Sequence, residues 1–177
     1  QTPNTSATNS SGFNGRGAGN RSESTGGYNE LTTALRLWSK TEPSAGNYLI
    51  GNLSYNSASF GVNIAEPVKR GNSVRLLKDS TSLSDGQTGT YTGNDGRMYS
   101  TICIGTQEWL SENLAETKYQ NGDDISEVQD SATWISLTTG ARSSYSNTQA
   151  NVGVGSRITS SDDWVVPDYY DWDDLQI

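Results

Sequence analysis

Residues 47–64, NYLIGNLSYNSASFGVNI, predict two β-strands that flank a turn near residues 56–58. In the second half of this stretch, the apolar residues Phe60, Val62 and Ile64 alternate with small or polar residues. An alternation with a period of two is typical of a strand that is buried on one side. We therefore expect a hairpin with one apolar face and one small, polar face.

Further strands are expected on both sides of this hairpin. SVRLL at 73–77 predicts a strand that buries Val74 and Leu76 and exposes Arg75. YSTICI at 99–104 predicts another strand.

Two short helices complete the expected elements. One covers Tyr28–Leu35 after a pair of glycines, and the other covers Asp168–Ile177. Pro167 stands at a favourable position to start the second helix, and its first turns carry aspartates, which the helix dipole favours. The predicted fold class is α+β, with short antiparallel strands, two short helices and long loops.

The composition excludes several classes of chemistry. The 177 residues include no His and one Cys, so the chain has no His general base, no thiolate zinc site and no internal disulfide. The net charge of −8 argues against a nucleic-acid partner. No apolar run reaches the roughly 18 residues of a membrane-spanning helix, so we expect no membrane insertion.

The charge changes sign along the chain. There are 8 basic and 4 acidic side chains up to residue 78, and 4 basic and 16 acidic ones beyond it. The change falls in DSTSLSDGQTGTYTGNDG, residues 79–96, a polar and Gly-rich stretch that is typical of a linker. We expect two halves of opposite charge, residues 1–79 and 97–177, joined by a linker at 80–96.

Motifs in both halves resemble one known family. DGRMYSTICIGTQEWLSENL (95–114), followed by TKYQNGDDI and SATWISLTTGA, is similar to the opening of the Fibrobacter succinogenes major paralogous domain. DDWVVPDYYDWDDL (162–175) is similar to a Trp- and Pro-containing helix of that family. The segments that resemble its later and closing motifs are PNTSATNSSGF (3–13), WSKTE (38–42), GNLSYNSAS (51–59) and GNSVRLLKD (71–79).

The order of these motifs differs from that of the family. The closing half comes first here, and the opening half follows it. Two explanations are open: the domain is circularly permuted, or the chain combines the second half of one tandem copy with the first half of the next.

The resemblance implies a C-type lectin-like fold and a binding module of secreted or surface proteins of bacteria related to Bacteroides and of their phages. In some relatives, diversity-generating retroelements vary positions near the closing end, which corresponds to residues 28–64 here. The resemblance thus places the ligand surface on this hairpin face. The ligand-binding residues that we assign to it are Tyr28, Arg36, Leu37, Tyr48, Ile50, Asn52, Phe60 and Asn63.

The composition of this face supports the assignment. No charged residue occurs between Pro43 and Ala65, and aromatic residues stand among Asn, Ser and Gly. The binding surfaces of antibodies have a similar composition, in which aromatic side chains provide contact area and small polar side chains provide adaptable hydrogen bonds. Leu49, Leu53 and Tyr55 are expected in the core instead.

We therefore expect a non-catalytic extracellular recognition or adhesion module that binds a glycan or protein receptor, on a cell surface or a virion. The alternative is a structural subunit of a surface fibre or virion in which neighbouring copies complete each other's domain. A recognition module of this kind needs no cofactor. For a structural subunit, the binding partners are other copies of the same chain.

The remaining chemistry-bearing residues give weaker indications. Six aspartates between residues 162 and 174 leave calcium as an alternative cofactor, although their spacing is not that of an EF-hand. Carboxylate pairs such as Glu108 and Glu112 occur, but nothing places a pair across one cleft, so no enzyme is expected. Cys103 alternates with isoleucines and is expected to be a buried, inert thiol.

Overall fold

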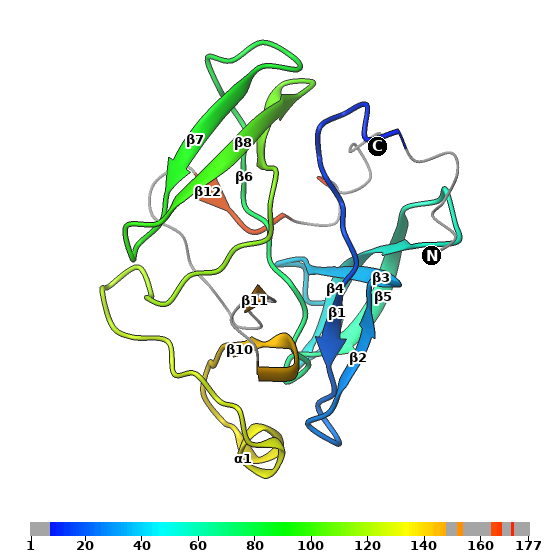
Figure 1. Ribbon diagram of the computed structural model, residues 1–177, viewed down its shortest axis with the longest axis vertical. Coiled ribbons are helices and arrows are strands. Elements are labelled where there is room, and N and C mark those ends of the chain that lie inside the picture. Colours follow the sequence, from blue (N-terminus) through cyan, green and yellow to red (C-terminus); the bar gives the residue numbers. More distant parts are fainter. Residues whose placement is uncertain (1–7, 148–151, 154–163, 168–170, 172–177) are drawn as a thin grey trace.

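The computed structural model describes residues 8–147, 152–153, 164–167 and 171. It is mostly β-sheet, with two five-stranded sheets and a short α-helix, in agreement with the expected small α+β class. Figure 1 shows the second sheet, mainly green, at one end of the molecule and the first sheet, blue to cyan, beside it. No helix in the described part of the chain combines the length and apolar character that a membrane crossing requires.

The first sheet has the strand order β2-β1-β3-β4-β5. Its strands are β1 (Ala18–Arg21), β2 (Tyr28–Leu31), β3 (Ala34–Trp38), β4 (Asn47–Ser54) and β5 (Gly61–Pro67). β1 and β3 pair in parallel, and the other neighbours pair antiparallel.

The hairpin predicted at 47–64 is confirmed, because β4 and β5 pair antiparallel around a turn at 55–60. The expected alternation along its second strand holds only in part. Phe60 and Val62 pack against a hydrophobic cluster, whereas Ile64 is 41% exposed.

A β-bulge explains this difference. Ile50 lies opposite Ile64, but Asn52 lies opposite Gly61, so β5 contains one residue more than β4 between these two pairs. An extra residue reverses the face to which the following side chains point. Apolar positions on either side of the bulge therefore lie on opposite faces of the sheet.

The helix predicted over Tyr28–Leu35 is wrong, because β2 and β3 occupy this segment. Glu30 and Thr32 have φ values of +63° and +64°, which lie outside the helical region and reverse the chain between the two strands. β3 lies between β1 and β4, and this tertiary pairing overrides the local helix preference. The helix expected at Asp168–Ile177 lies outside the described residues, Asp171 apart.

The second sheet is antiparallel throughout and has the order β12-β6-β9-β8-β7. Its strands are β6 (Leu77–Lys78), β7 (Thr88–Thr92), β8 (Met98–Ile104), β9 (Gln107–Leu110) and β12 (Trp164–Val165). β8 confirms the strand predicted at 99–104, and Cys103 within it is fully buried, which raises the pKa of its thiol. The segment 80–96 is more than a linker, because it supplies β7 with its buried Tyr91.

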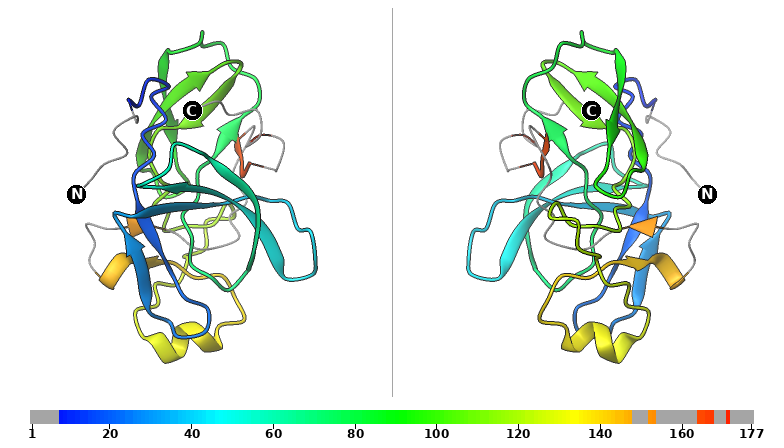
Figure 2. Two further views of the ribbon diagram at one scale, coloured as in Figure 1. Left: turned by 90° about the vertical axis from the view of Figure 1, so that its right-hand side faces the viewer. Right: turned by 90° about the vertical axis from the view of Figure 1, so that its left-hand side faces the viewer.

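The connection that follows the second sheet carries the remaining elements. They are the helix α1 (Ser131–Ser136), β10 (Ser143–Ser144), the 3-10 turn η1 (Tyr145–Asn147) and β11 (Val152–Gly153). Asp130 caps α1, since its carboxylate accepts a hydrogen bond of 2.7 Å from the backbone N–H of Thr133. Figures 1 and 2 show α1 at the opposite end of the molecule from the β7–β8 hairpin.

Two buried clusters join the halves of the chain, and each contains residues from both. The first cluster comprises Trp38, Ile50, Val74, Leu76, Tyr91, Tyr99, Leu110, Leu114, Ala115 and Ile125. The second comprises Phe13, Leu35, Leu37, Leu77, Ile102 and Trp109. Burial of apolar surface is the main stabilising contribution to folding, so the two halves depend on each other for their cores.

Arg75 is only 2% exposed, so the predicted exposure of its side chain is wrong. Its guanidinium donates to the carbonyl oxygens of Phe13 and Asn14 and to Asn113 Oδ1, and it lies 4.2 Å from the centroid of the Phe13 ring. Burial lowers the pKa of Arg75 to about 9, which leaves the side chain charged at neutral pH. Only a multidentate donor satisfies acceptors from two distant segments at once.

Replacing Arg75 with Met should lower the free energy of unfolding by about 3 kcal/mol, because buried carbonyl groups lose their donor. Chemical denaturation followed by tryptophan fluorescence measures this change. Arg16→Met is the matched control at an exposed arginine, with an expected change within about 0.5 kcal/mol. An Arg75→Met protein as stable as the wild type would contradict the role of this side chain.

Candidate functional site

The predicted ligand-binding residues do not form one surface. Leu37 and Ile50 are 0% and 1% exposed and belong to the second and first clusters, so their assignment to a ligand surface is wrong. Both were placed on the surface because the sequence does not show that each face of β3 and β4 packs against the other half of the chain. Asn63 lies in β5, and its side chain is outside what the structure describes.

Four predicted residues, namely Arg36, Tyr48, Asn52 and the buried Ile50, share one face of the first sheet. Arg36 lies directly opposite Asn52, and Tyr48 lies four residues from Asn52 along β4. Phe60 is on the other face, since a Cβ atom at Gly51 would lie 2.5 Å from its ring. Tyr28 lies on β2, on the far side of β1 from β3.

Tyr55 was expected in the core but is 44% exposed at the start of the β4–β5 turn. Ile64, opposite Ile50 across the bulge, is the second exposed apolar residue of this hairpin. We call the set Arg36, Tyr48, Asn52, Tyr55 and Ile64 the hairpin surface.

Charged residues border the hairpin surface, although the stretch 43–65 contains none. Arg36 donates to both oxygens of Glu30, at 2.7 and 2.9 Å, and to Glu66. Arg70 donates to Glu66 at 3.0 Å and to Glu23 at 2.8 Å. We call these five residues the charged network. It forms because Glu66 follows directly after the uncharged stretch and is carried onto the sheet by β5.

The arginines of the charged network change the acidity of its carboxylates. The hydrogen bond from Arg36 lowers the pKa of Glu30, and that from Arg70 lowers the pKa of Glu23. Two amides attach to the same network, since Asn20 donates to Glu30 at 2.7 Å and Asn72 donates to Glu66 at 2.6 Å. Both asparagines also line a pocket that lies next to Tyr28.

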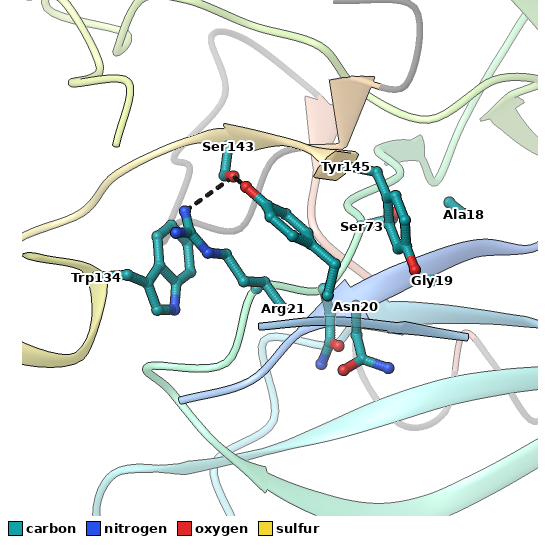
Figure 3. Close-up of a pocket in the computed structure, with 11 residues that line it drawn as sticks. Ala18, Gly19, Asn20, Arg21, Ser73, Trp134, Ser143 and Tyr145 are labelled. Carbon is teal, nitrogen blue, oxygen red and sulfur yellow. Dashed lines mark hydrogen bonds between the residues drawn. The ribbon is translucent and has the colours of Figure 1, made fainter. Parts of the chain in front are cut away.

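This pocket lies between β1, β2 and the connection that carries α1 and η1 (Figure 3). The side chains of Trp134, Arg21, Tyr28 and Tyr145 form a row along it, which we call the stack, and the Tyr145 ring is tilted by 48° relative to the Tyr28 ring. The Arg21 guanidinium lies 4.4 Å from the centroid of the Trp134 ring and 4.9 Å from that of Tyr28, and the rings of Tyr28 and Tyr145 are 5.1 Å apart.

Hydrogen bonds fix this stack in place. Arg21 donates to the carbonyls of Gly26, Val128 and Gln129 and to Ser143 Oγ, at 2.5 to 3.0 Å. The Tyr28 hydroxyl lies 2.6 Å from Ser143 Oγ. Burial lowers the pKa of Arg21. The pocket walls are therefore held rigidly from both halves of the chain.

Two buried polar atoms of the pocket residues have no hydrogen-bond partner. They are Oδ1 of Asn72, a residue that is 2% exposed, and Nε1 of Trp134, a residue that is 3% exposed. Buried polar groups are nearly always satisfied, so these two atoms are exceptional. The pocket holds a cavity of about 30 Å³.

Sequence reasoning found only Tyr28 among the pocket residues used above. Arg21, Trp134 and Tyr145 come from segments that the topology brings together, and no local pattern predicts their proximity. Trp134 in SATWIS and the buried Arg21 gave no signal of their own, because a single tryptophan or arginine is compatible with many environments.

The alternative chemistries find little support in the described residues. Within them, no group of three or more His, Cys, Asp or Glu side chains is placed to hold a metal ion. Most of the aspartates considered for calcium lie outside the described residues. Glu108 accepts from the hydroxyls of Thr81 and Thr101, whereas Glu112 pairs with Arg97, so these two carboxylates have different partners.

No family model matches the chain, and no curated protein or solved structure matches it. The resemblance to the Fibrobacter succinogenes major paralogous domain stays a prediction that rests on the motifs quoted above.

The charged network predicts a specific pH dependence of stability. Folding lowers the pKa of Glu23 and Glu30, so their contribution is present above about pH 4.5 and is lost as the pH falls through their folded-state values. Arg36→Met should lower the free energy of unfolding at pH 7 by about 2 kcal/mol, between the values typical of exposed and buried pairs. Urea denaturation at a series of pH values measures both effects.

The difference between wild type and Arg36→Met should shrink on acidification, because protonated Glu30 no longer benefits from Arg36. Lys118→Met removes an exposed ion pair with Asp124 and serves as the control. A wild-type and an Arg36→Met stability curve that stay parallel down to about pH 2 would show that the network does not set this dependence.

Proposed function

We propose that this protein is a non-catalytic, extracellular recognition or adhesion module that binds a glycan or protein receptor. Two regions form the proposed binding site, the hairpin surface and the pocket beside Tyr28, and we call them together the binding face. One observation supports the proposal: a stack of aromatic and guanidinium groups borders a cavity lined by Trp134 and Asn72, which carry an unpartnered donor and an unpartnered acceptor. Ligand sites are usually preformed and lined by apolar and aromatic side chains with a few precisely placed polar groups.

The composition of the binding face favours a glycan as the receptor. The pocket offers aromatic rings together with amide, hydroxyl and indole groups, which suit a neutral, hydroxyl-rich ligand. Its one charged group, Arg21, is already occupied by three carbonyls and a hydroxyl. The exposed Tyr55 and Ile64 add apolar contact area on the hairpin.

The sequence resemblance supports the finer assignments. A C-type lectin-like fold, a surface or virion location and a source among Bacteroides-like bacteria or their phages all follow from the family motifs. Two sheets of short strands with long connections are compatible with such a fold.

The alternative function, a structural subunit whose neighbouring copies complete each other's domain, has less support. Both hydrophobic clusters combine the two halves within a single chain. Completion by a second copy is therefore not required for either cluster.

The hairpin surface can be tested on a glycan microarray. The double variant Tyr55→Ser, Ile64→Ser should weaken binding at least tenfold, which corresponds to about 1.4 kcal/mol, because it removes the exposed apolar contacts. Its thermal unfolding should be unchanged, since neither side chain belongs to a buried cluster.

Met98→Ser is the matched control, because Met98 is 66% exposed on the second sheet. Equal binding by the double variant and this control would contradict a role of the hairpin surface. Absence of binding to every glycan on the array would contradict the glycan as receptor.

A further inference from the structure

We infer that the pocket beside Tyr28 binds the acetamido group of an N-acetylated sugar. This inference rests on the proposed function and names the chemical group that the pocket takes. Two unpartnered atoms carry it: the indole Nε1 of Trp134 and the amide Oδ1 of Asn72, both on side chains that are buried and line the same cavity.

The hydrogen-bonding roles of these atoms are fixed. An indole N–H can only donate. The orientation of the Asn72 amide follows from Glu66, because a carboxylate only accepts and the Asn72 group 2.6 Å from it must therefore be the NH₂ group. Oδ1 of Asn72 is left as an acceptor.

The charged network keeps Asn72 in this orientation. Glu66 is 5% exposed, and its Oε1 accepts hydrogen bonds from Arg36 and Arg70 while its Oε2 accepts from Asn72. The pocket thus presents one donor and one acceptor of defined position. A secondary amide is their complement, since its carbonyl accepts from Trp134 and its N–H donates to Asn72.

The cavity is large enough for a small terminal group of a ligand but not for a group in the middle of a longer chain. A single water needs roughly 10–15 Å³ of such space, so about 30 Å³ accommodates two groups of that size, such as a carbonyl oxygen and a methyl group. A sugar ring is too large to enter. A peptide backbone amide continues on both sides, whereas an acetamido group ends in its methyl group, which suits a small cavity.

The walls suit that methyl group. Trp134, Tyr28 and Tyr145 supply aromatic carbon, and the stack around Arg21 holds the rings in place before the ligand arrives. Gly71 lies against the indole, because a Cβ atom there would lie 2.9 Å from Trp134 Cζ2. Preorganised walls reduce the entropy lost on binding.

The indole N–H signals in a ¹H–¹⁵N NMR spectrum test this inference directly on the whole chain. N-acetylglucosamine or N-acetylgalactosamine, titrated into the millimolar range, should shift the signal of Trp134. The other four tryptophans serve as internal controls. Glucose and glucosamine, which have no acetamido group, should give at least tenfold weaker binding.

Trp134→Phe should abolish the binding of N-acetylglucosamine, because it keeps an aromatic ring and removes the donor. Isothermal titration calorimetry measures this binding, since the variant has no Trp134 indole signal. Trp109→Phe makes the same change in the second cluster and should leave the affinity for N-acetylglucosamine within twofold of the wild type. If Trp134→Phe does not fold, the Trp134 signal of the wild-type protein still decides the question.

Three results would overturn the inference: an unshifted Trp134 signal with both N-acetylated sugars, equal shifts with glucose, or a shift with an N-acetylated dipeptide alone. The last result would assign the pocket to a peptide. Microarray binding that depends on Tyr55 and Ile64 while the Trp134 signal stays unshifted would reject only the acetamido site and leave the proposed function intact.

Discussion

Buried guanidinium groups that donate to main-chain carbonyls join the two halves of this chain. Arg75 donates to Asn113 Oδ1 and to the carbonyl oxygen of Leu110 in the second half, as well as to the carbonyls of Phe13 and Asn14 in the first. Arg21 donates from β1 to the carbonyls of Val128 and Gln129 in the second half. A chain with only 32% hydrophobic residues has limited apolar area to bury, and burying a charge is costly unless it is hydrogen-bonded. Each arginine meets this condition by satisfying several carbonyl or amide acceptors at once, so the two halves need each other.

The same principle connects the fold with the candidate site. Arg21 fixes the stack that borders the pocket, and the charged network fixes the amide of Asn72 through Glu66. These hydrogen-bonded groups thereby position the two atoms without a partner, Trp134 Nε1 and Asn72 Oδ1. This arrangement supports the proposed binding site, because buried polar atoms are nearly always hydrogen-bonded.

Local patterns predicted part of this structure. The hairpin at 47–64, the strand at 99–104 and the burial of Cys103 follow from alternation with a period of two, which depends only on neighbouring residues. The helix at 28–35, the exposed Arg75 and the surface positions of Leu37 and Ile50 were wrong, because each depends on partners far away in the sequence. Of the pocket residues discussed, only Tyr28 was predicted, because the others come together from segments that are distant in the sequence.

Amide hydrogen exchange tests most directly whether the two halves form one cooperative unit. Leu110 and Leu114 donate to Leu76 and Val74 across the halves, while the amides of β3 and β4 lie within the first. The account predicts that the most protected amides of both groups exchange with one free energy, equal to that of global unfolding. Free energies for the two groups that differ by several kcal/mol would contradict it, because they would show that the halves open independently.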